Sequence, residues 1–312
     1  MSQATSVPDL PASPSPFVVR DAGFEAVLGD APRLAHVIDV DAHEGPVYVP
    51  GADALYVTTL PQQPGPRVDI KRLSLESMTV STVRPNAEAA NGMALGHDGR
   101  LIVCEQLGGA IAAVDRLSGA RTLLTQGFNS PNDIVVNSDG TIWFTDPSYG
   151  WLQGFRPRPR LRDAVHRYDP CTRAVTTAAD SFDKPNGLCF SPDESILYVT
   201  DSGANHEPGS FEPSRPHHIK AFDVLDGGQL AGERIFADVE PGFPDGIKVD
   251  ADGRVYSSSF SGVQVFNPSG RPIGEIELPG AVNFCFGGPD KNVLFITADT
   301  AIHAAYLQAK GP

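Results

Sequence analysis

Six segments of the chain repeat one pattern, and this repeat constrains the fold more than any other feature of the sequence. Each segment opens with a polar residue, usually followed by Gly, and continues as an apolar strand-like run, a turn and a second apolar run. The opening residues are Glu44, Asn91, Asn132, Asn186, Asp245 and Asn283. Self-similar units of about 40 to 50 residues are typical of repeat architectures in which each unit packs against its neighbours.

Each segment reads as a β-hairpin, because its connector (HDG, SDG, SPDE, ADG or GPDK) is rich in turn residues. Further strand-like stretches such as AIAAVDRL, VHRYDP and HIKAFDVL follow, and then RTLLT and RIFADV. About four strands per unit is the size of a propeller blade. The sequence therefore predicts an all-β, six-bladed β-propeller with four-stranded blades around a central metal-binding channel and few helices. A different repetitive β-solenoid is the alternative, although these units are long for a β-helix coil.

The ends of the chain are expected to complete this single domain. Residues 1–20 are predicted to be a flexible polar leader, because MSQATSVPDLPASPSP has neither the basic nor the apolar region of a signal peptide. Residues 21–312 then form one propeller, in which FEAVLG (24–29) and IHAAYL (302–307) are predicted to be strands that share the blade joining the two ends.

The composition of the chain limits which kinds of partner it can be expected to bind and in which cellular compartment it can be expected to act. A formal net charge of −14 argues against nucleic acid, and no stretch approaches the ~20 apolar residues that span a bilayer. The 4 cysteines lack C-x-x-C spacing, which favours buried free thiols and a reducing cytoplasm. We expect a small-molecule substrate, no nucleic-acid or membrane partner, and a monomer or weak homo-oligomer.

The six opening residues are expected to form a ring, here called the axial ring. In a propeller the innermost strand of every blade begins near one mouth of the central channel, so equivalent residues meet there. All six carry a side-chain oxygen, and oxygen donors suit a hard divalent cation. Turn formation by Asn-Gly and Asp-Gly explains any one segment but not six in register. Register places all six residues, Asn91 and Asn283 included, in the ring, with a divalent cation predicted at its centre.

Five motifs also resemble a known family. They are HEGPVYV (43–49), NSPNDIVVNSDGTIWFTDPSYG (129–150), KPNGLCFSPDESILYVTDS (184–202), FPDGIKVDADG (243–253) and CFGGPDKNVLFIT (285–297). Together they make the chain similar, from about Phe24 to Gly311, to the regucalcin/gluconolactonase family, which includes senescence marker protein and luciferin-regenerating enzyme.

The resemblance implies one divalent metal ion, Ca²⁺ first and Mg²⁺, Mn²⁺ or Zn²⁺ as alternatives. It implies Glu44, Asn186 and Asp245 as ligands and Asn132 as a fourth ligand or a substrate contact. Asp245 takes the role of proton acceptor or donor by position. The family often has a pair of arginines after CE, where this chain has Gly108, Gly109 and Ala110; this departure weighs against an aldonolactone substrate.

The expected activity is that of a gluconolactonase-like lactonase, a metal-dependent hydrolase of a sugar lactone or related cyclic ester. In this hypothesis the metal polarises the carbonyl, water attacks it, and Asp245 is the catalytic residue. The predicted substrate contacts are Asn91, Glu105, Asn132, Tyr149 and Asn283. The alternatives are other metal-assisted chemistry at the same site (phosphotriester hydrolysis, isomerisation or cyclisation) and a non-catalytic calcium-binding propeller.

Two long insertions are candidates for substrate recognition, because loops on a rigid scaffold commonly carry it. Residues 150–163 contain four arginines, and residues 203–218 are rich in Pro and Gly. Asp146 and Asp201, at the ends of predicted strands, are interpreted as turn caps with ligand roles as the alternative.

Overall fold

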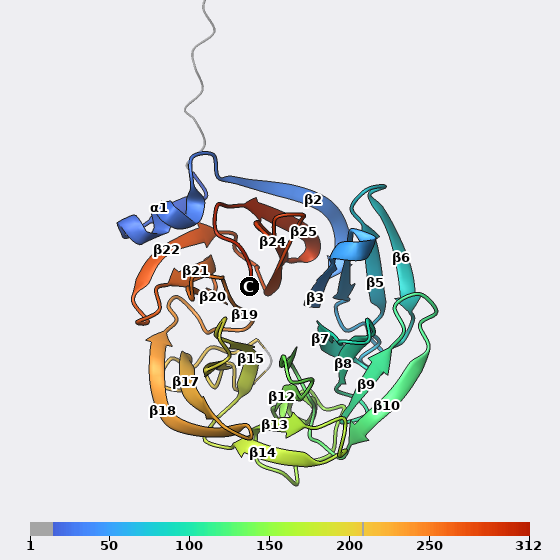
Figure 1. The fold of residues 1–312 in the computed structure, drawn as a ribbon. Helices are drawn as coiled ribbons and strands as arrows, with labels where there is room; N and C mark the ends of the chain where they lie inside the picture. The colour runs from blue at the N-terminus through green and yellow to red at the C-terminus, as the bar shows by residue number, and fades with distance from the viewer. Residues whose placement is uncertain (1–14, 208) are drawn as a thin grey trace, which may run out of the picture.

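The structure is a computed structural model that describes residues 15–207 and 209–312. These residues form six antiparallel sheets arranged around one axis, five with four strands and one with five (Figure 1). The predicted six-bladed propeller is confirmed. Helical structure in the described residues is limited to α1 (Ala22–Leu28), α2 (Tyr149–Leu152) and the 3₁₀ turn η1 (Pro50–Ala52).

The first four blades run in chain order, with the earliest strand of each nearest the axis. Blade 1 contains β3 (Glu44–Val49), β4 (Ala54–Thr58), β5 (Ile70–Ser74) and β6 (Thr79–Arg84). Blade 2 contains β7 (Ala90–Leu95), β8 (Leu101–Glu105), β9 (Ala110–Val114) and β10 (Arg121–Gln126). Blade 3 contains β11 (Ile134–Val136), β12 (Ile142–Asp146), β13 (Ala164–Tyr168) and β14 (Val175–Ala179). Blade 4 contains β15 (Pro185–Phe190), β16 (Ile196–Asp201), β17 (His218–Leu225) and β18 (Gln229–Asp238).

The last two blades each include a strand from the N-terminal region. Blade 5 contains β19 (Ile247–Val249), β20 (Val255–Ser258), β21 (Gly262–Phe266), β22 (Pro272–Glu277) and, at its outer edge, β1 (Phe17–Val19). Blade 6 contains β23 (Asn283–Gly287), β24 (Val293–Thr297), β25 (Asp299–Tyr306) and the outer strand β2 (Arg33–Ala42). The β2–β25 pairing therefore joins the two ends of the ring.

The prediction for this closing blade is right at one end and wrong at the other. Residues 302–307 do contribute to β25, but residues 24–29 are not its partner, because most of them lie in α1. Asp21 caps that helix by accepting a hydrogen bond from the Gly23 amide at 2.9 Å. The apolar Phe24, Val27 and Leu28 are spaced to share one helical face, and all three are buried.

Part of the segment predicted to be a flexible leader forms a strand. Residues 1–14 lie outside the described residues, but Phe17–Val19 form β1, which pairs with β22. Arg20, just after β1, makes an ion pair with Glu275 at 3.0 Å. The end of the expected flexible leader is thus part of blade 5.

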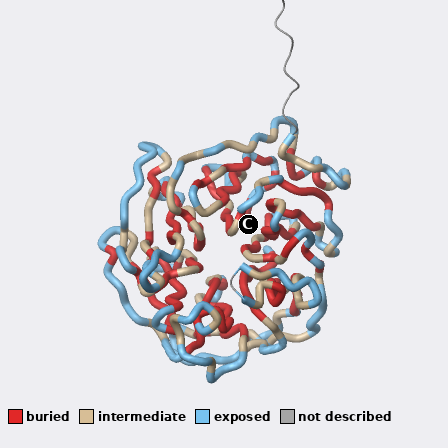
Figure 2. Tube along the Cα trace, turned by 180° about the vertical axis from the view of Figure 1, so that it is seen from behind, coloured by how far each residue is buried: buried red, intermediate tan, exposed pale blue. Residues whose placement is uncertain are grey.

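The core lies between the blades and is made by their inner and middle strands. Every residue of β8 and β9 is buried, whereas the outermost strand β6 is largely exposed, and Figure 2 shows this gradient around the ring. Six apolar clusters are found in the described residues, several joining neighbouring blades, such as the packing of Val47 and Tyr56 with Met93 and Val103. No helix in the described part of the chain is long and apolar enough to cross a membrane. The four cysteines are free thiols, and Cys104, Cys189 and Cys285 are buried as predicted, whereas Cys171 is exposed.

Candidate metal centre and active site

The axial ring forms at the mouth of the channel where the inner strands begin, here called the upper mouth. Four of its six members are almost fully buried, with exposed fractions of 3% for Glu44, 5% for Asn132, 4% for Asn186 and 2% for Asn283. Polar side chains this deeply buried must find partners among themselves, in water or in a bound ion.

The glycine that follows most ring residues is explained by how closely the inner strands approach each other at the axis. A Cβ atom added at Gly92 would lie 2.6 Å from the carbonyl oxygen of Asn132, and one added at Gly246 would lie 2.6 Å from Cγ of Asn283. At Gly187 it would fall against the carbonyl oxygen of Asp245. The glycines thus let each ring residue sit directly against the next blade.

Threonines on the second strands fix the backbone of the ring across blade boundaries. Thr145 donates its hydroxyl to the carbonyl oxygen of Asn186 at 2.6 Å, and Thr200 donates to that of Asp245 at 3.1 Å. Thr58 likewise donates to Asn91, at 3.1 Å. These three ring positions are therefore held by the blade before them as well as by their own.

Two buried carboxylates order the loops that lead into the ring. Asp146 accepts hydrogen bonds from the backbone amides of Asn129 at 2.9 Å and Ser130 at 2.8 Å. Asp201 does the same for Asp183 at 3.0 Å and Lys184 at 2.8 Å. Their geometry matches the turn-cap interpretation. These loops carry the chain into Asn132 and Asn186.

Inside the ring the amides divide into two kinds. Asn283 uses its side chain within the protein, donating to Glu44 at 2.7 Å and accepting from the Phe284 amide at 2.8 Å. In contrast, the side-chain oxygens of Asn91 and Asn132 are buried and have no hydrogen-bond partner among the described residues. Unpaired buried amide oxygens beside carboxylates are what a hard cation would satisfy, so the residues present fit a divalent ion.

The electrostatics of the ring point the same way. Burial raises the pKa of the Glu44 carboxyl, partly offset by nearby His43. Burial and the charge of Glu44 together raise the pKa of Asp245 well above its usual range. Like charges in a desolvated site destabilise each other's ionised form, and a bound cation would remove that penalty.

A third carboxylate, Asp133, follows Asn132 where the other segments mostly have Gly. It is 3% exposed, burial raises its pKa, and one of its oxygens has no hydrogen-bond partner in the described chain. Within the described residues, no group of three or more His, Cys, Asp or Glu side chains could hold a metal ion by itself. The asparagine oxygens are therefore an essential part of the candidate donor set.

His43, the residue before Glu44, forms a hydrogen-bonded pair that the sequence did not predict. Its Nδ1 lies 2.7 Å from Oδ1 of Asp299. Burial opposes the imidazolium, but the hydrogen bond to Asp299 and the charge of Glu44 outweigh it and raise the pKa of His43. Asp299 lines a cavity of about 230 Å³ that also contains Asp245. The only feature of the sequence that points to a role for His43 is its position next to Glu44.

Two predicted substrate contacts outside the ring differ in their surroundings. Tyr149 is 7% exposed at the start of α2, and burial together with the Asp245 carboxylate raises the pKa of its hydroxyl well above the usual range. Glu105 is 1% exposed, and both of its oxygens accept hydrogen bonds from Arg121, at 2.7 and 2.6 Å. Tyr149 is thus close to the ring, whereas the carboxylate of Glu105 is engaged by β10.

The arginine-rich loop is anchored through Arg156. Its guanidinium donates to the carbonyl oxygens of Asn129 at 2.8 Å, Leu107 at 2.8 Å and Phe128 at 2.9 Å. A Cβ atom at Gly109 would fall against this guanidinium, and Gly109 has a φ of +56°. These contacts explain why glycine stands where the family often has a basic residue.

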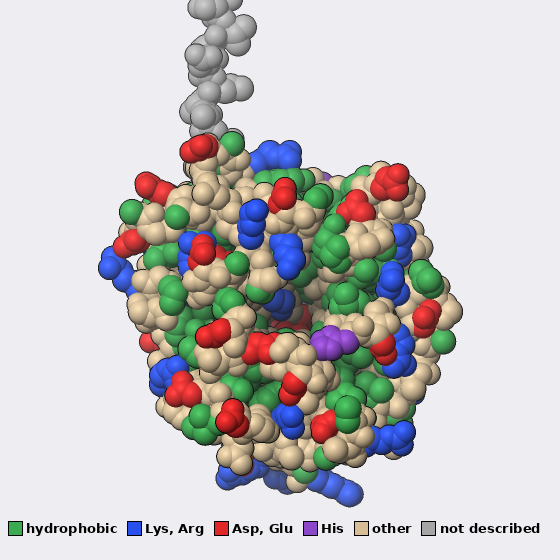
Figure 3. Space-filling view, viewed as in Figure 1, with side chains coloured by type: hydrophobic (Ala, Val, Ile, Leu, Met, Phe, Trp, Pro, Cys, Tyr) green, Lys and Arg blue, Asp and Glu red, His purple; other side chains and the backbone are tan. Residues whose placement is uncertain are grey.

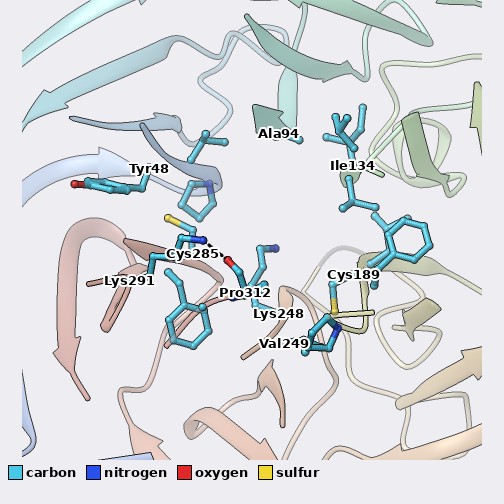
Figure 4. A pocket seen from close by; sticks show the side chains of 18 of the residues that line it. Tyr48, Ala94, Ile134, Cys189, Lys248, Val249, Cys285, Lys291 and Pro312 are labelled. Atoms are coloured by element: carbon cyan, nitrogen blue, oxygen red, sulfur yellow. Dashed lines mark hydrogen bonds between the residues drawn. The ribbon is translucent and has the colours of Figure 1, made fainter. Parts of the chain in front are cut away.

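The opposite end of the channel, the lower mouth, has a different chemistry. Its cavity of about 430 Å³ is walled mainly by apolar side chains, with Lys248, Cys189 and Cys285 among them (Figure 4). Figure 3 shows a hollow at the centre of one face with hydrophobic side chains around it and a basic side chain inside. Burial raises the pKa of Cys189 and of Cys285 to about 12, so neither thiol is a thiolate ligand at neutral pH. The candidate site is therefore the upper mouth.

Comparison with known proteins agrees with this architecture. Residues 42–300 match the family described as SMP-30/Gluconolactonase/LRE-like region. The chain belongs to this family. It is 30% identical to the lactonohydrolase oryL of Aspergillus oryzae, over 89% of this chain and 71% of that protein. It is 29% identical to a gluconolactonase of Zymomonas mobilis, over 86% and 82% of the two chains. A solved structure of a gluconolactonase from Xanthomonas campestris is 35% identical, covers 97% of this chain and 99% of its own, and has a TM-score of 0.81.

Proposed function

We propose that this protein is a metal-dependent hydrolase that opens a lactone ring at the upper mouth of the channel. The observation that carries the proposal is the buried axial ring, in which the oxygens of Asn91 and Asn132 have no hydrogen-bond partner among the described residues and lie with the carboxylates of Glu44 and Asp245. The relatives named lactonohydrolase and gluconolactonase support lactone hydrolysis as the reaction class.

Glu44, Asn132, Asn186 and Asp245 would hold the ion, and Ca²⁺ is the cation best suited to such an all-oxygen set. When bound, a divalent cation polarises the lactone carbonyl and offsets the negative charge that develops on its oxygen. Asn283 keeps Glu44 in place through its 2.7 Å hydrogen bond. Because the ring is buried, it limits the access of water that would compete with the lactone for the ion.

Asp245 is the residue proposed to move the proton. A water molecule adds its oxygen to the carbonyl carbon, and Asp245 accepts the proton that this water loses. The ring C–O bond then breaks, and the proton returns from Asp245 to the departing ring oxygen, giving a hydroxy acid. We expect Asn91, Asn132 and Tyr149 to contact the substrate from the same mouth.

The setting of the enzyme is part of the proposal. Three of the four cysteines are buried and all four are free, which suits a reducing compartment such as the cytoplasm. We expect the enzyme to act there on a small molecule as a monomer or weak homo-oligomer.

The test is ring opening followed by pH-stat on a panel of lactones, with metal-stripped protein and protein restored with Ca²⁺, Mg²⁺, Mn²⁺ or Zn²⁺. Stripping should abolish turnover, and Asp245→Asn should lower kcat by about 100-fold or more, as expected for loss of a proton-transferring group. The matched control is Glu76→Gln, an exposed carboxylate in the turn between β5 and β6.

Turnover that survives both chelation and Asp245→Asn would contradict the proposal. Tight metal binding without turnover of any lactone or phosphotriester would favour the non-catalytic calcium-binding alternative. Calorimetry with Glu44→Gln and Asn186→Ala tests the metal centre separately, and each variant should bind Ca²⁺ at least tenfold more weakly.

A further inference from the structure

Three phenylalanines form an aromatic cluster beside the candidate active site. The rings of Phe211 and Phe260 have centroids 5.4 Å apart, and those of Phe243 and Phe260 are 5.2 Å apart, both in edge-to-face arrangements. Phe211 is 44% exposed and Phe260 is 48% exposed. These are the two exposed phenylalanines among the described residues, and they lie in contact with each other rather than scattered over the surface.

The cluster is connected to the reaction centre through one cavity. Phe243 and Phe260 line the same 230 Å³ cavity as Asp245, and Ala281 and Val282 extend its apolar wall. The remaining lining is polar and includes Ser258, Ser259 and Asp299. A ligand in this cavity would meet both oxygen-bearing groups and aromatic rings.

The aromatic wall is built into the fold. The Phe260 amide donates to the carbonyl oxygen of Pro241 at 3.1 Å, which ties the β20–β21 turn to the segment before Asp245. Gly242 allows the Phe260 ring to lie against the backbone, because a Cβ there would overlap the ring. Phe260 is thus held beside the metal-ligand segment although it faces solvent.

Phe211 reaches the cluster from the long insertion at residues 203–218. The Glu212 amide donates to Ala204 at 2.9 Å, and the Ala204 amide donates to Pro216 at 2.8 Å, so the insertion folds back on itself. Arg215 fixes its base by an ion pair with Asp183 at 2.6 Å. These contacts position Phe211 over Phe260 from a neighbouring blade.

We propose that this aromatic cluster is a specificity subsite that binds an aryl or alkyl substituent of the lactone while the lactone ring lies at Asp245. The proposal rests on the proposed function and adds the substrate class. A polyhydroxylated sugar lactone would leave its hydroxyl groups unpaired against three aromatic rings, whereas an apolar substituent would cover exposed Phe211 and Phe260. Apolar contact with aromatic walls supports discrimination of about tenfold or more between such substrates.

The test compares γ-phenyl-γ-butyrolactone with unsubstituted γ-butyrolactone, and includes glucono-δ-lactone. The wild-type enzyme should have a kcat/KM at least tenfold higher for the phenyl lactone than for its parent. Phe260→Ala and Phe211→Ala should each lower kcat/KM for the phenyl lactone about three- to tenfold, mainly through KM, and change that for the parent less than twofold. Phe260→Leu should retain most of the preference. Leu117→Ala, a residue 81% exposed between β9 and β10, is the control.

A second measurement separates this proposal from the proposed function. Calorimetry of metal-loaded protein with 5-phenylpyrrolidin-2-one, the lactam analogue, and with pyrrolidin-2-one measures binding without turnover. Tighter binding of the phenyl lactam that is lost in Phe260→Ala supports the subsite even if no lactone is hydrolysed. Equal kcat/KM values for the two lactones, a preference for glucono-δ-lactone, or a phenyl preference unchanged in both alanine variants would overturn it.

Discussion

Replacing Gly92 with Ala tests whether close packing of the inner strands sets the axial ring. The added Cβ would lie 2.6 Å from the Asn132 carbonyl oxygen and 2.6 Å from Cα of Asp133. Ordinary contact begins at 3.4 Å, so β7 and the loop before β11 must separate by about 0.8 Å. Both atoms belong to backbone, so no side-chain rotation relieves the overlap. The 2.7 Å hydrogen bond from the Gly92 amide to Asn132 would also lengthen.

Overpacking of this kind costs about 1 to 3 kcal/mol of unfolding free energy. Because the displaced atoms belong to a proposed metal ligand, Ca²⁺ affinity should fall about tenfold, which corresponds to about 1.4 kcal/mol of binding free energy. Urea denaturation and calorimetry measure the two effects. The control is Gly51→Ala, since a Cβ there meets no atom within 4 Å, and both quantities should stay unchanged. If Gly92→Ala binds Ca²⁺ and resists urea like the wild type, the close-packing explanation of the repeat is wrong.

Other contacts lead to further expectations. Asp146→Ala should lower the free energy of unfolding measured in urea by about 2 to 3 kcal/mol, because the loop before Asn132 loses two buried charge-assisted hydrogen bonds. The same change should weaken Ca²⁺ binding. An unchanged Ca²⁺ affinity would show that this loop does not position the metal centre. At pH 8 a thiol reagent should modify Cys171 alone in the folded protein and all four cysteines in denaturant, since the other three are buried; rapid reaction of a second thiol would contradict the packed blades. Arg156→Ala should speed tryptic cleavage after Arg160, because three anchoring hydrogen bonds are lost; wild-type cleavage rates would show that other contacts hold the loop.

The blades were predictable because each repeats strong local signals. An apolar run, a turn and a second apolar run recur six times, and the repetition outweighs the ambiguity of any single strand. The closure was harder, because FEAVLG satisfies a strand and a helix pattern equally over six residues. The helix forms because Asp21 caps its N-terminus and because Phe24 and Val27 lie on the same buried face. The outer strand of blade 6 is instead β2, which pairs with β25.

The site was predictable only in part, since register locates ring residues but not the direction of their side chains. Asn91 and Asn283 occupy equivalent positions, yet Asn283 donates to Glu44 while the Asn91 oxygen has no partner among the described residues. The repeat pattern did not indicate Asp133, because this residue stands at the position where most of the segments have Gly. The pairing of His43 with Asp299 joins residues 256 positions apart, so the sequence around His43 does not indicate its partner.

The two mouths of the channel differ in how their charged and apolar side chains are arranged. At the upper mouth the ring oxygens converge on the axis, whereas Phe243 and Phe260 lie towards the rim beside Asp245. At the lower mouth the charge has the opposite sign, because Lys248 stands among apolar walls. Of the two mouths, the upper one is therefore the better place for the proposed cation, because the buried carboxylates Glu44 and Asp133 lie there. Because the inner strands that carry the ring pack against the inner strands of the neighbouring blades, the chemistry is constrained by the scaffold. The insertion that carries Phe211 is not constrained in this way, so substrate preference can change there without disturbing the ring.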